Sequence, residues 1–392
     1  MIYLDHNSTS PIAPSVIAKM TETLQAGFVN PASQHRAGQA ARRQLEIYRS
    51  ELIEMLGGNA KGMAADQLVF TSGGTESDNL ALFGLAALSR QRLIEKGAID
   101  SDAYPKVIVS AIEHPAVIAA AEQLARLGFE VHKLPVNQQG LVCQDTLRRW
   151  IESPTALVSI MLANNETGVI EPIQELASCC RQQGVLFHTD AVQAIGKIRV
   201  SFNELGVDAL SLTAHKFAGP RGIGGLLLKH GVAPEPQLFG GFQQMAIRPG
   251  TEDVALVAGM WQALRDYTDA PAEREQHLRQ LRDHLQDGLQ QRFDGMVVNS
   301  AQVSRTPQTL NLAFPEFDRQ SFLMSADMAG LAISTGSACA SGSSEPSPVL
   351  MAMGLPKTTI EASIRISVGP SNSLDEIEQA IERISGIVQR NS

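Results

Sequence analysis

The strongest constraint on the fold is a regular alternation of short apolar runs and amphipathic segments between residues 66 and 230. The apolar runs are QLVF, KVIVSA, ALVSIML, VLFHTDA, ALSLTA and GGLLLKH. Helical patterns follow the first three runs, beginning at Thr75, after Pro115 and at Pro172. Strands that alternate with helices in this way are typical of a mainly parallel, doubly wound sheet that is covered on both faces.

Polar sequences follow these runs at the places where the strands are expected to end. They are TSGGTES, AIEHP, LANNETG, HTDAVQ and TAHK. Ligands of open α/β sheets bind beyond the carboxyl ends of the strands. We therefore expect these five sequences to converge on one functional site.

The pattern changes after about residue 255. Two helices are predicted, Val254 to about Tyr267 and Glu275 to Gln291, followed by TLNLAFP, a Gly/Ser-rich loop and SIRISV. A last helix begins at Ser373, which has Glu376 three residues later in a capping-box pattern. This part of the chain predicts a smaller α+β domain.

Composition excludes several classes of function. The 392 residues carry a net charge of −9, which disfavours binding to nucleic acid or to an anionic membrane surface. Apolar stretches are too short for a transmembrane helix, and the N-terminus lacks a signal-peptide pattern. The 4 cysteines include no C-x-x-C pair, so neither a disulfide framework nor a metal site is expected. We expect a cytoplasmic enzyme.

Lys216 and Asp190 are the first candidates for chemistry. Lys216 ends an apolar strand, where a lowered pKa would suit Schiff-base formation, although an ordinary loop lysine has the same pattern. Asp190 ends the preceding strand, one strand–helix–strand return earlier. A buried carboxylate there needs a cationic partner, either a pyridinium nitrogen or an arginine.

The sequence TSGGTES supplies a third element. It follows a strand and opens a helix, so the main-chain amides around Gly73, Gly74 and Thr75 could bind a phosphate, although such turns often only cap a helix. A phosphate cradle, a pyridinium partner and a Schiff-base lysine together describe one cofactor. No dinucleotide fingerprint G-x-G-x-x-G follows a strand.

At this point the chain resembles the cysteine desulfurases, pyridoxal-phosphate enzymes of the class V aminotransferase group. The resemblance extends over ten blocks in order: YLDHNSTSP, NPASQHRAGQAAR, TSGGTESDN, IEHPAV, NNETGVIEPI, HTDAVQAIGK, TAHKFAGPRGIGG, RPGTEDV, STGSACASGSSEPS and IRISVG. It implies an aspartate aminotransferase-like fold, with a mainly parallel seven-stranded sheet in a large domain and a smaller α+β domain. The expected division is 15–258 for the large domain, and 1–14 with 259–392 for the smaller one.

The resemblance also implies how pyridoxal 5'-phosphate would be held. Lys216 would form the Schiff base, Asp190 would pair with the pyridine nitrogen, and His114 would stack on the ring as a further catalytic residue. The phenolic oxygen would accept a hydrogen bond from Gln193, with Asn165 nearby. The phosphate would be bound by Gly74, Thr75, Thr213 and His215, together with Thr251 from the second subunit of a homodimer.

The same resemblance implies the substrate and the reaction. Arg365 would bind the carboxylate of L-cysteine, with Asn7 and Asn165 beside it. Lys216 would remove the Cα proton, and the thiolate of Cys339 would take the substrate sulfur as a persulfide and leave L-alanine. The sulfur would pass to an acceptor protein, such as an iron–sulfur scaffold. Small residues around Cys339 suit a nucleophile that hands sulfur onward.

Two departures from the family pattern and two alternatives accompany this hypothesis. Gln244 and Met245 stand where an acid and an arginine are usual, and the chain ends at QRNS, without the tail that contacts a scaffold protein in housekeeping relatives. A selenocysteine lyase or a cysteine C–S lyase would share the cofactor, but would not require Cys339 in its loop. A cofactor-bearing regulatory subunit would need none of Lys216, Asp190 and Cys339 intact.

Overall fold

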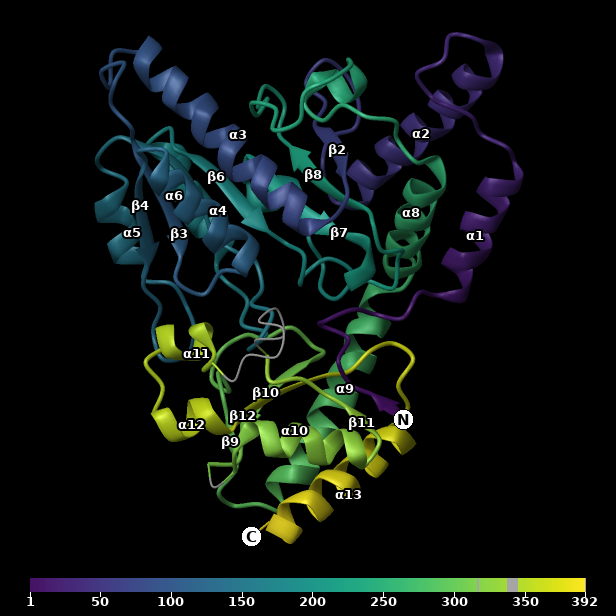
Figure 1. The fold of residues 1–392 in the computed structure, drawn as a ribbon, viewed down its shortest axis with the longest axis vertical. Helices are drawn as coiled ribbons and strands as arrows, with labels where there is room; N and C mark the ends of the chain where they lie inside the picture. The colour runs from purple at the N-terminus through teal and green to yellow at the C-terminus, as the bar shows by residue number, and fades with distance from the viewer. Residues whose placement is uncertain (316, 337–344, 392) are drawn as a thin grey trace.

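A computed structural model describes residues 1–315, 317–336 and 345–391 of the chain. The chain forms two lobes that meet along one side of a central sheet (Figure 1). The upper lobe in this view holds the large sheet and its helices, and the lower lobe holds the C-terminal helices and both chain termini.

The large sheet has seven strands in the order β2-β8-β7-β6-β5-β3-β4. Its strands are β2 (Gln67–Thr71), β3 (Lys106–Ser110), β4 (Glu130–Leu134), β5 (Thr155–Ser159), β6 (Leu186–Asp190), β7 (Ala209–Thr213) and β8 (Gly224–Leu228). Only β8 runs antiparallel to its neighbours, β2 and β7. The four other pairings are parallel. The predicted mainly parallel, seven-stranded sheet is confirmed.

Both faces of this sheet are buried, which explains why its strands are almost continuously apolar. Along β3, Val107 and Val109 pack into the hydrophobic cluster under α3 and α4, whereas Ile108 packs into the cluster on the other face. The helices of this lobe are α1 (Pro14–Gln25), α2 (Arg36–Met55), α3 (Gly74–Glu95), α4 (Pro115–Arg126), α5 (Gln144–Trp150), α6 (Ile173–Gln182), α7 (Phe202–Leu205) and α8 (Val254–Thr268).

The lower lobe has a core of its own, built from residues at both ends of the chain. Leu4 packs there with Leu281, Ile364 and Ile384. Its elements are β1 (Ile2–Tyr3), α9 (Pro271–Gln290), β9 (Val297–Val298), β10 (Thr309–Ala313), α10 (Arg319–Met328), β11 (Leu331–Ala332), α11 (Pro348–Ala352), α12 (Lys357–Ala362), β12 (Ser363–Ser367) and α13 (Leu374–Asn391). β10 pairs antiparallel with β9 and β12, and β1 pairs parallel with β11.

The predicted capping box at the start of α13 is present. The main-chain nitrogen of Glu376 donates to Ser373 Oγ, and that of Ser373 donates to Glu376 Oε2, both over 3.2 Å. Ile377, Ile381 and Ile384 of the following helix are buried in the lower core. The 3.6-residue spacing of these side chains therefore predicted the buried face of the helix correctly.

The chain between β1 and α1 crosses from the lower lobe to the upper one. Asn7 donates from its main-chain nitrogen to Ser367 Oγ of β12 over 2.9 Å, and Ser10 donates from its main-chain nitrogen to the oxygen of His215 over the same distance. We call residues 5–9 the N-terminal strap. This strap lies where the ends of β6 and β7 face the end of β12.

Candidate active site

Lys216 lies at the end of β7, in the short 3-10 turn η1 (Ala214–Lys216), and its amine contacts the N-terminal strap. Its Nζ donates to the main-chain oxygens of Asn7 and Ser8, over 2.8 and 2.7 Å. The turn follows a fully buried strand, so the backbone that carries Lys216 is fixed by the core. The amine is thus directed toward the space between the lobes.

Asp190 is the last residue of β6 and is 4% exposed. Its Oδ1 accepts a hydrogen bond from the main-chain nitrogen of Val192 over 2.8 Å, and the described residues donate none to Oδ2. Burial raises the pKa of Asp190 to about 6, against the lowering effects of the Val192 hydrogen bond, Lys216 and Lys197. A cation placed against Oδ2 would favour the charged carboxylate.

His114 caps the N-terminus of α4. Its Nδ1 accepts a hydrogen bond from the main-chain nitrogen of Ala116 over 3.1 Å, so the proton of a neutral ring lies on Nε2. Burial, and after it the charge of Lys216, lower the pKa of His114 to about 4. The imidazole is therefore neutral near pH 7.

Gln193 lies in the turn after β6 and is buried between two partners. Its Nε2 donates to the main-chain oxygen of Asn7 over 2.9 Å, and its Oε1 accepts from Lys197 Nζ over 2.9 Å. The oxygen of Asn7 also accepts from Lys216. Gln193 therefore presents its amide nitrogen on the same side as the Lys216 amine.

A hollow of about 370 Å³ lies where β2 turns into α3. It is lined by Thr9, Ser72, Gly73, Gly74, Thr75, Glu76, Thr213, His215, Arg221 and Gly222. A Cβ at Gly73 would meet no other atom closer than Thr213 Oγ1 at 3.8 Å, so a side chain there would occupy the hollow. At Gly224 a side chain would not fit, because a Cβ there would lie 2.7 Å from the carbonyl carbon of Gly73.

This hollow has the chemistry of an anion site. The first amides of α3, a 22-residue helix, face it without partners inside the helix. The four phosphate residues predicted within this chain, Gly74, Thr75, Thr213 and His215, all line it. His215 Nδ1 lies 3.1 Å from Thr9 Oγ1, which ties the hollow to the N-terminal strap.

Two charged residues of this hollow were not predicted. Arg221 lines it and adds a cation. The sequence GPRG, which begins three residues after Lys216, could have indicated it. Glu76 lies at the helix start, where Arg248 Nε donates to it over 2.7 Å. Burial acts to raise the pKa of Glu76, but the hydrogen bonds from Arg248 and Ser72 outweigh it and lower the pKa.

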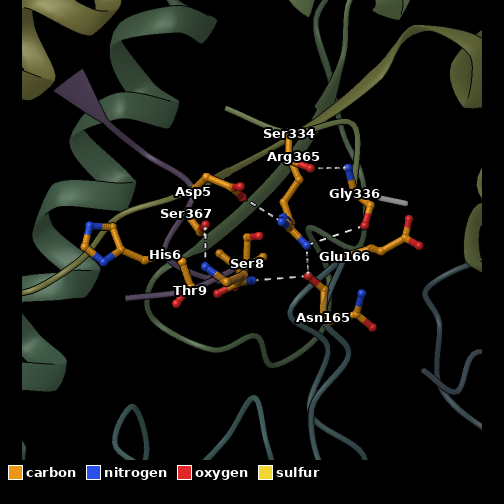
Figure 2. A network of polar contacts seen from close by, with 12 residues as sticks. Asp5, His6, Ser8, Thr9, Asn165, Glu166, Ser334, Gly336, Arg365 and Ser367 are labelled. Atoms are coloured by element: carbon orange, nitrogen blue, oxygen red, sulfur yellow. Dashed lines mark hydrogen bonds and ion pairs between the residues drawn. The ribbon is translucent and has the colours of Figure 1, made fainter. Parts of the chain in front are cut away.

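Arg365 lies on β12 and joins three parts of the chain (Figure 2). Its Nη2 donates to Asp5 Oδ1 over 2.6 Å, and its Nη1 donates to the main-chain oxygen of Asn165 over 3.0 Å and of Gly336 over 3.5 Å. Its Nε is buried and has no hydrogen-bond partner among the described residues. The Oδ1 atom of Asn165 is likewise buried without a partner in the part of the chain that the structure describes.

Asn7, predicted beside the substrate, is 1% exposed, and its side chain lies next to Asn165 and to residues of the lower lobe. Its Nδ2 donates to Thr309 Oγ1 over 2.8 Å and to the main-chain oxygen of Asn165 over 3.2 Å. Its Oδ1 accepts from Gln308 Nε2 over 3.1 Å. Asn7 therefore meets the site at two places. Its main-chain oxygen accepts from Gln193 and Lys216, and its Nδ2 shares the main-chain oxygen of Asn165 with Arg365.

Thr251 is exposed and lies in the loop before α8, outside the lining of the 370 Å³ hollow.

Cys339 lies outside the described residues. The described residues on either side of residues 337–344 both approach Glu166, a buried acid. Ser347 Oγ donates to Glu166 Oε2 over 2.6 Å, and a Cβ at Gly336 would lie 2.9 Å from the same oxygen.

The unusual Gln244 pairs with the edge strand β2. Its Oε1 accepts from the main-chain nitrogen of Phe70 over 2.6 Å, and its Nε2 donates to the oxygen of Phe70 over 2.9 Å. Gln244, Met245 and Ala246 all have positive φ, 50°, 56° and 60°, which is strained for residues with a side chain. A glutamate could not make the second of these hydrogen bonds when ionised.

The described residues, 1–315, 317–336 and 345–391, contain neither a membrane-spanning helix nor a metal cluster. No helix among them is long and apolar enough to cross a membrane. Within the same residues, no group of three or more His, Cys, Asp or Glu side chains could hold a metal ion.

The chain is similar to several known proteins. The family model described as "Aminotransferase class-V" matches residues 2–380. A cysteine desulfurase IscS of Dictyoglomus turgidum is 37% identical over 390 residues, which cover 99% of this chain and 95% of the relative. The X-ray structure of a NifS-like protein from Rickettsia africae superimposes with a TM-score of 0.86 at 29% identity and covers 99% of both chains. SspA in complex with cysteine has a TM-score of 0.75 at 26% identity, covering 95% of this chain and 100% of that one.

The chain belongs to the class-V aminotransferase family. Within it, the chain is similar to cysteine desulfurases over nearly its whole length. The predictions of the family, of the transferase fold and of an enzyme that depends on pyridoxal 5'-phosphate are confirmed.

Proposed function

We propose that this enzyme converts L-cysteine to L-alanine and transfers the sulfur, as a persulfide on Cys339, to an acceptor protein. One observation carries the proposal. The N-terminal strap is contacted at Asp5 by Arg365 and at Asn7 and Ser8 by Lys216. A cation that suits a carboxylate and an amine that suits Schiff-base chemistry therefore face the same short segment.

The residues present fit pyridoxal 5'-phosphate. The hollow in front of Gly73 suits a phosphate, and Asp190 Oδ2, to which no described residue donates, suits a pyridinium N–H. The ring of this cofactor would withdraw electrons from the Cα of an amino acid whose amine it binds, which makes the Cα proton easier to remove. Lys216 would hold it covalently, with His114 against the ring and Gln193 at its phenolic oxygen. The phosphate would be bound by Gly74, Thr75, Thr213, His215 and, from a second subunit, Thr251.

The substrate would be oriented by Arg365. Its buried guanidinium already pairs with the carboxylate of Asp5, and its Nε is left over for another acceptor. Asn165 places one unsatisfied side-chain oxygen and one main-chain oxygen beside it. Carboxylate binding here would leave the Cα proton toward the side of Lys216, which we propose to be the base that removes it.

Cys339 would complete the reaction. Its thiolate attacks the sulfur of L-cysteine, so that an S–S bond forms and the Cβ–S bond breaks. The carbon skeleton leaves as L-alanine after protonation, and the sulfur stays on the enzyme for an acceptor. The ends of the segment that carries Cys339 are tied to Glu166 and, through Gly336, to Arg365.

We propose a homodimer in which Thr251 reaches the partner's phosphate site. Large apolar side chains exposed near Thr251 support a contact there: Phe239, Phe242 and Met245 are 87%, 93% and 69% exposed.

We also propose a cytoplasmic location, which cell fractionation tests. We further propose a division into residues 15–258 and residues 1–14 with 259–392. The lower core, which joins residues from both ends of the chain, supports two domains, whereas α8 packs into the upper core as far as Tyr267 and favours a boundary after that helix. Limited proteolysis tests where the boundary lies.

The test is to supply purified enzyme with L-cysteine and with L-selenocysteine, and to measure alanine with and without a thiol acceptor. A desulfurase forms alanine from L-cysteine and stalls after about one turnover per site when no acceptor removes the persulfide. Continuous release of free sulfide or selenide without an acceptor would instead show a lyase.

A further inference from the structure

Lys197 is a buried amine for which the proposed function has no task. It is 5% exposed and lies one helical turn after Gln193, in the segment that follows β6. Burial lowers the pKa of Lys197 well below its usual range, the nearby charges of Lys216 and Arg365 lower it further, and Asp190 opposes them. Burying an amine costs free energy, and a hydrogen bond to a buried acceptor offsets that cost. The partner of Lys197 therefore shows what its burial serves.

The hydrogen bond that Lys197 makes is directed at one atom. Among the described residues, Gln193 Oε1, 2.9 Å away, is the acceptor of its Nζ. The other end of the same amide donates from Nε2 to the main-chain oxygen of Asn7 over 2.9 Å. Because a carbonyl oxygen only accepts and a lysine amine supplies donors, the two contacts fix the orientation of the amide from both ends.

This orientation decides which edge of Gln193 meets the cofactor site. The nitrogen Nε2 carries two hydrogens, and one of them is used on Asn7. The second has no acceptor among the described residues. The oxygen of Asn7 also accepts from Lys216 Nζ over 2.8 Å, so this spare donor lies beside the amine that would hold the cofactor.

If the side-chain amide of Gln193 were rotated by half a turn, its oxygen and nitrogen would exchange places. The rotation would turn a carbonyl oxygen, with its lone pairs, toward a phenolic oxygen that carries negative charge, and the two would repel each other. A donor on Oε1 also polarises the amide and strengthens its N–H groups as donors. Lys197 therefore acts on the cofactor site without touching it.

We propose that Lys197 is a positioning residue, which holds Gln193 with its N–H donors toward the phenolic oxygen of the cofactor. This inference rests on the proposed role of Gln193 in binding pyridoxal 5'-phosphate. Lys197 would thus belong to the site although it takes no part in the chemical steps of the reaction.

The experiment is a double-mutant cycle on cofactor binding. Apoenzymes of the wild type, Lys197→Met, Gln193→Met and the double variant are titrated with pyridoxal 5'-phosphate, and both the dissociation constant and the absorption maximum are recorded. We expect each single variant to weaken binding roughly 3–10-fold, the size of one hydrogen bond, and to shift the maximum in the same direction. The double variant should be no weaker than Gln193→Met, because Lys197 acts only through that amide.

Conservative and distant variants complete the design. Lys197→Arg keeps a donor toward Oε1 and should restore part of the affinity and the wild-type absorption maximum. Lys229→Met removes a half-exposed lysine 4.0 Å from Asp208 and should change neither quantity. If urea titration shows that Lys197→Met is not folded, Lys197→Gln replaces it. This variant also retains a donor and should bind the cofactor nearly as the wild type does.

Three outcomes would count against the inference. Cofactor binding and absorption unchanged in Lys197→Met would overturn it, and so would effects of the two substitutions that multiply in the double variant. A loss of affinity in Lys197→Gln as large as that of Gln193→Met would overturn it as well. If wild-type apoenzyme bound no pyridoxal 5'-phosphate, the proposed function itself would fail. This result is distinguishable from a failure of the Lys197 inference, in which the wild type still binds the cofactor.

Discussion

Arg365 and Asp5 form an ion pair of 2.6 Å between Nη2 and Oδ1, at the place where the two lobes meet. The side chain of Arg365 is 3% exposed and that of Asp5 is 18% exposed, so water screens the pair only partly. The guanidinium thus binds the Asp5 carboxylate through one hydrogen bond, and its Nε has no partner among the described residues. In the proposed function this Nε is available to the carboxylate of L-cysteine.

We expect Arg365→Lys to weaken L-cysteine binding by about 1–3 kcal/mol, because a lysine cannot form the planar paired hydrogen bonds of a guanidinium. Cofactor content should not change, since Arg365 does not line the 370 Å³ hollow. Spectral titration with L-cysteine measures this. Arg292→Lys, a change in an exposed ion pair with Glu382, is the control. Unchanged affinity in Arg365→Lys would assign Arg365 to structure alone.

Lys216→Ala should abolish both turnover and the yellow colour of covalently held cofactor. The amine that contacts Asn7 and Ser8 is the one placed beside Asp190 and Gln193 for this chemistry. Absorption spectra and alanine production measure the two effects. Lys229→Ala, at the far end of β8, should retain both. A Lys216→Ala enzyme that still made alanine at a substantial rate would contradict the assignment.

Glu113→Gln should stabilise the protein at high pH. Burial raises the pKa of Glu113 from 4.5 to about 8, although hydrogen bonds from Ser110 and Met161 oppose the rise. The stability that the protonated carboxyl contributes is fully present below pH 4.5 and is lost as the pH rises to about 8.

Urea unfolding at two pH values measures this effect. At pH values near 9, Glu113→Gln should raise the free energy of unfolding above that of the wild type by about 1–3 kcal/mol. Near pH 5 the two proteins should be similar. The exposed Glu122→Gln is the control. Destabilisation by Glu113→Gln at the higher pH would show that the carboxylate is charged and paired in the folded enzyme.

The proposed homodimer predicts that Phe242→Asp produces monomers with loosened cofactor. A charge on a side chain that is 93% exposed in one subunit but buried against a partner would cost several kcal/mol on association. Thr251 would then be lost from the neighbouring phosphate site. Sedimentation and cofactor dissociation measure the two effects, and Met328→Asp, on an 88% exposed side chain of the other lobe, is the control. A wild-type monomer that retained its cofactor would refute the prediction.

Most of the fold could be predicted because strands buried on both faces leave a clear apolar signal. The antiparallel direction of β8 could not, since GGLLL has the same pattern in either direction. The candidate site was predicted where a residue ends a strand, as with Asp190 and Lys216. Contacts between residues far apart in the sequence could not be predicted.

Asn7 and Lys197 show why. Nothing near Asn7 in the sequence indicates that its side chain would be taken up by Thr309 and Gln308, some 300 residues away. For Lys197, a signal existed in its spacing of four from Gln193 in HTDAVQAIGK, which places both on one side of a helical turn. Its burial depends on the strap and the lower lobe, which the local sequence does not show.

The central claim is that Cys339 receives the sulfur, and peptide mass spectrometry after brief exposure to L-cysteine tests it most directly. We predict one added sulfur on the Cys339 peptide, with an equal amount of alanine, and none on Cys143, Cys179 or Cys180. Cys180 is buried and has a pKa raised to about 12, which disfavours its reactive thiolate. Cys339→Ser should bind the cofactor and L-cysteine but make no persulfide. Added sulfur on Cys179 or Cys180, or full activity in Cys339→Ser, would contradict the account and favour a lyase.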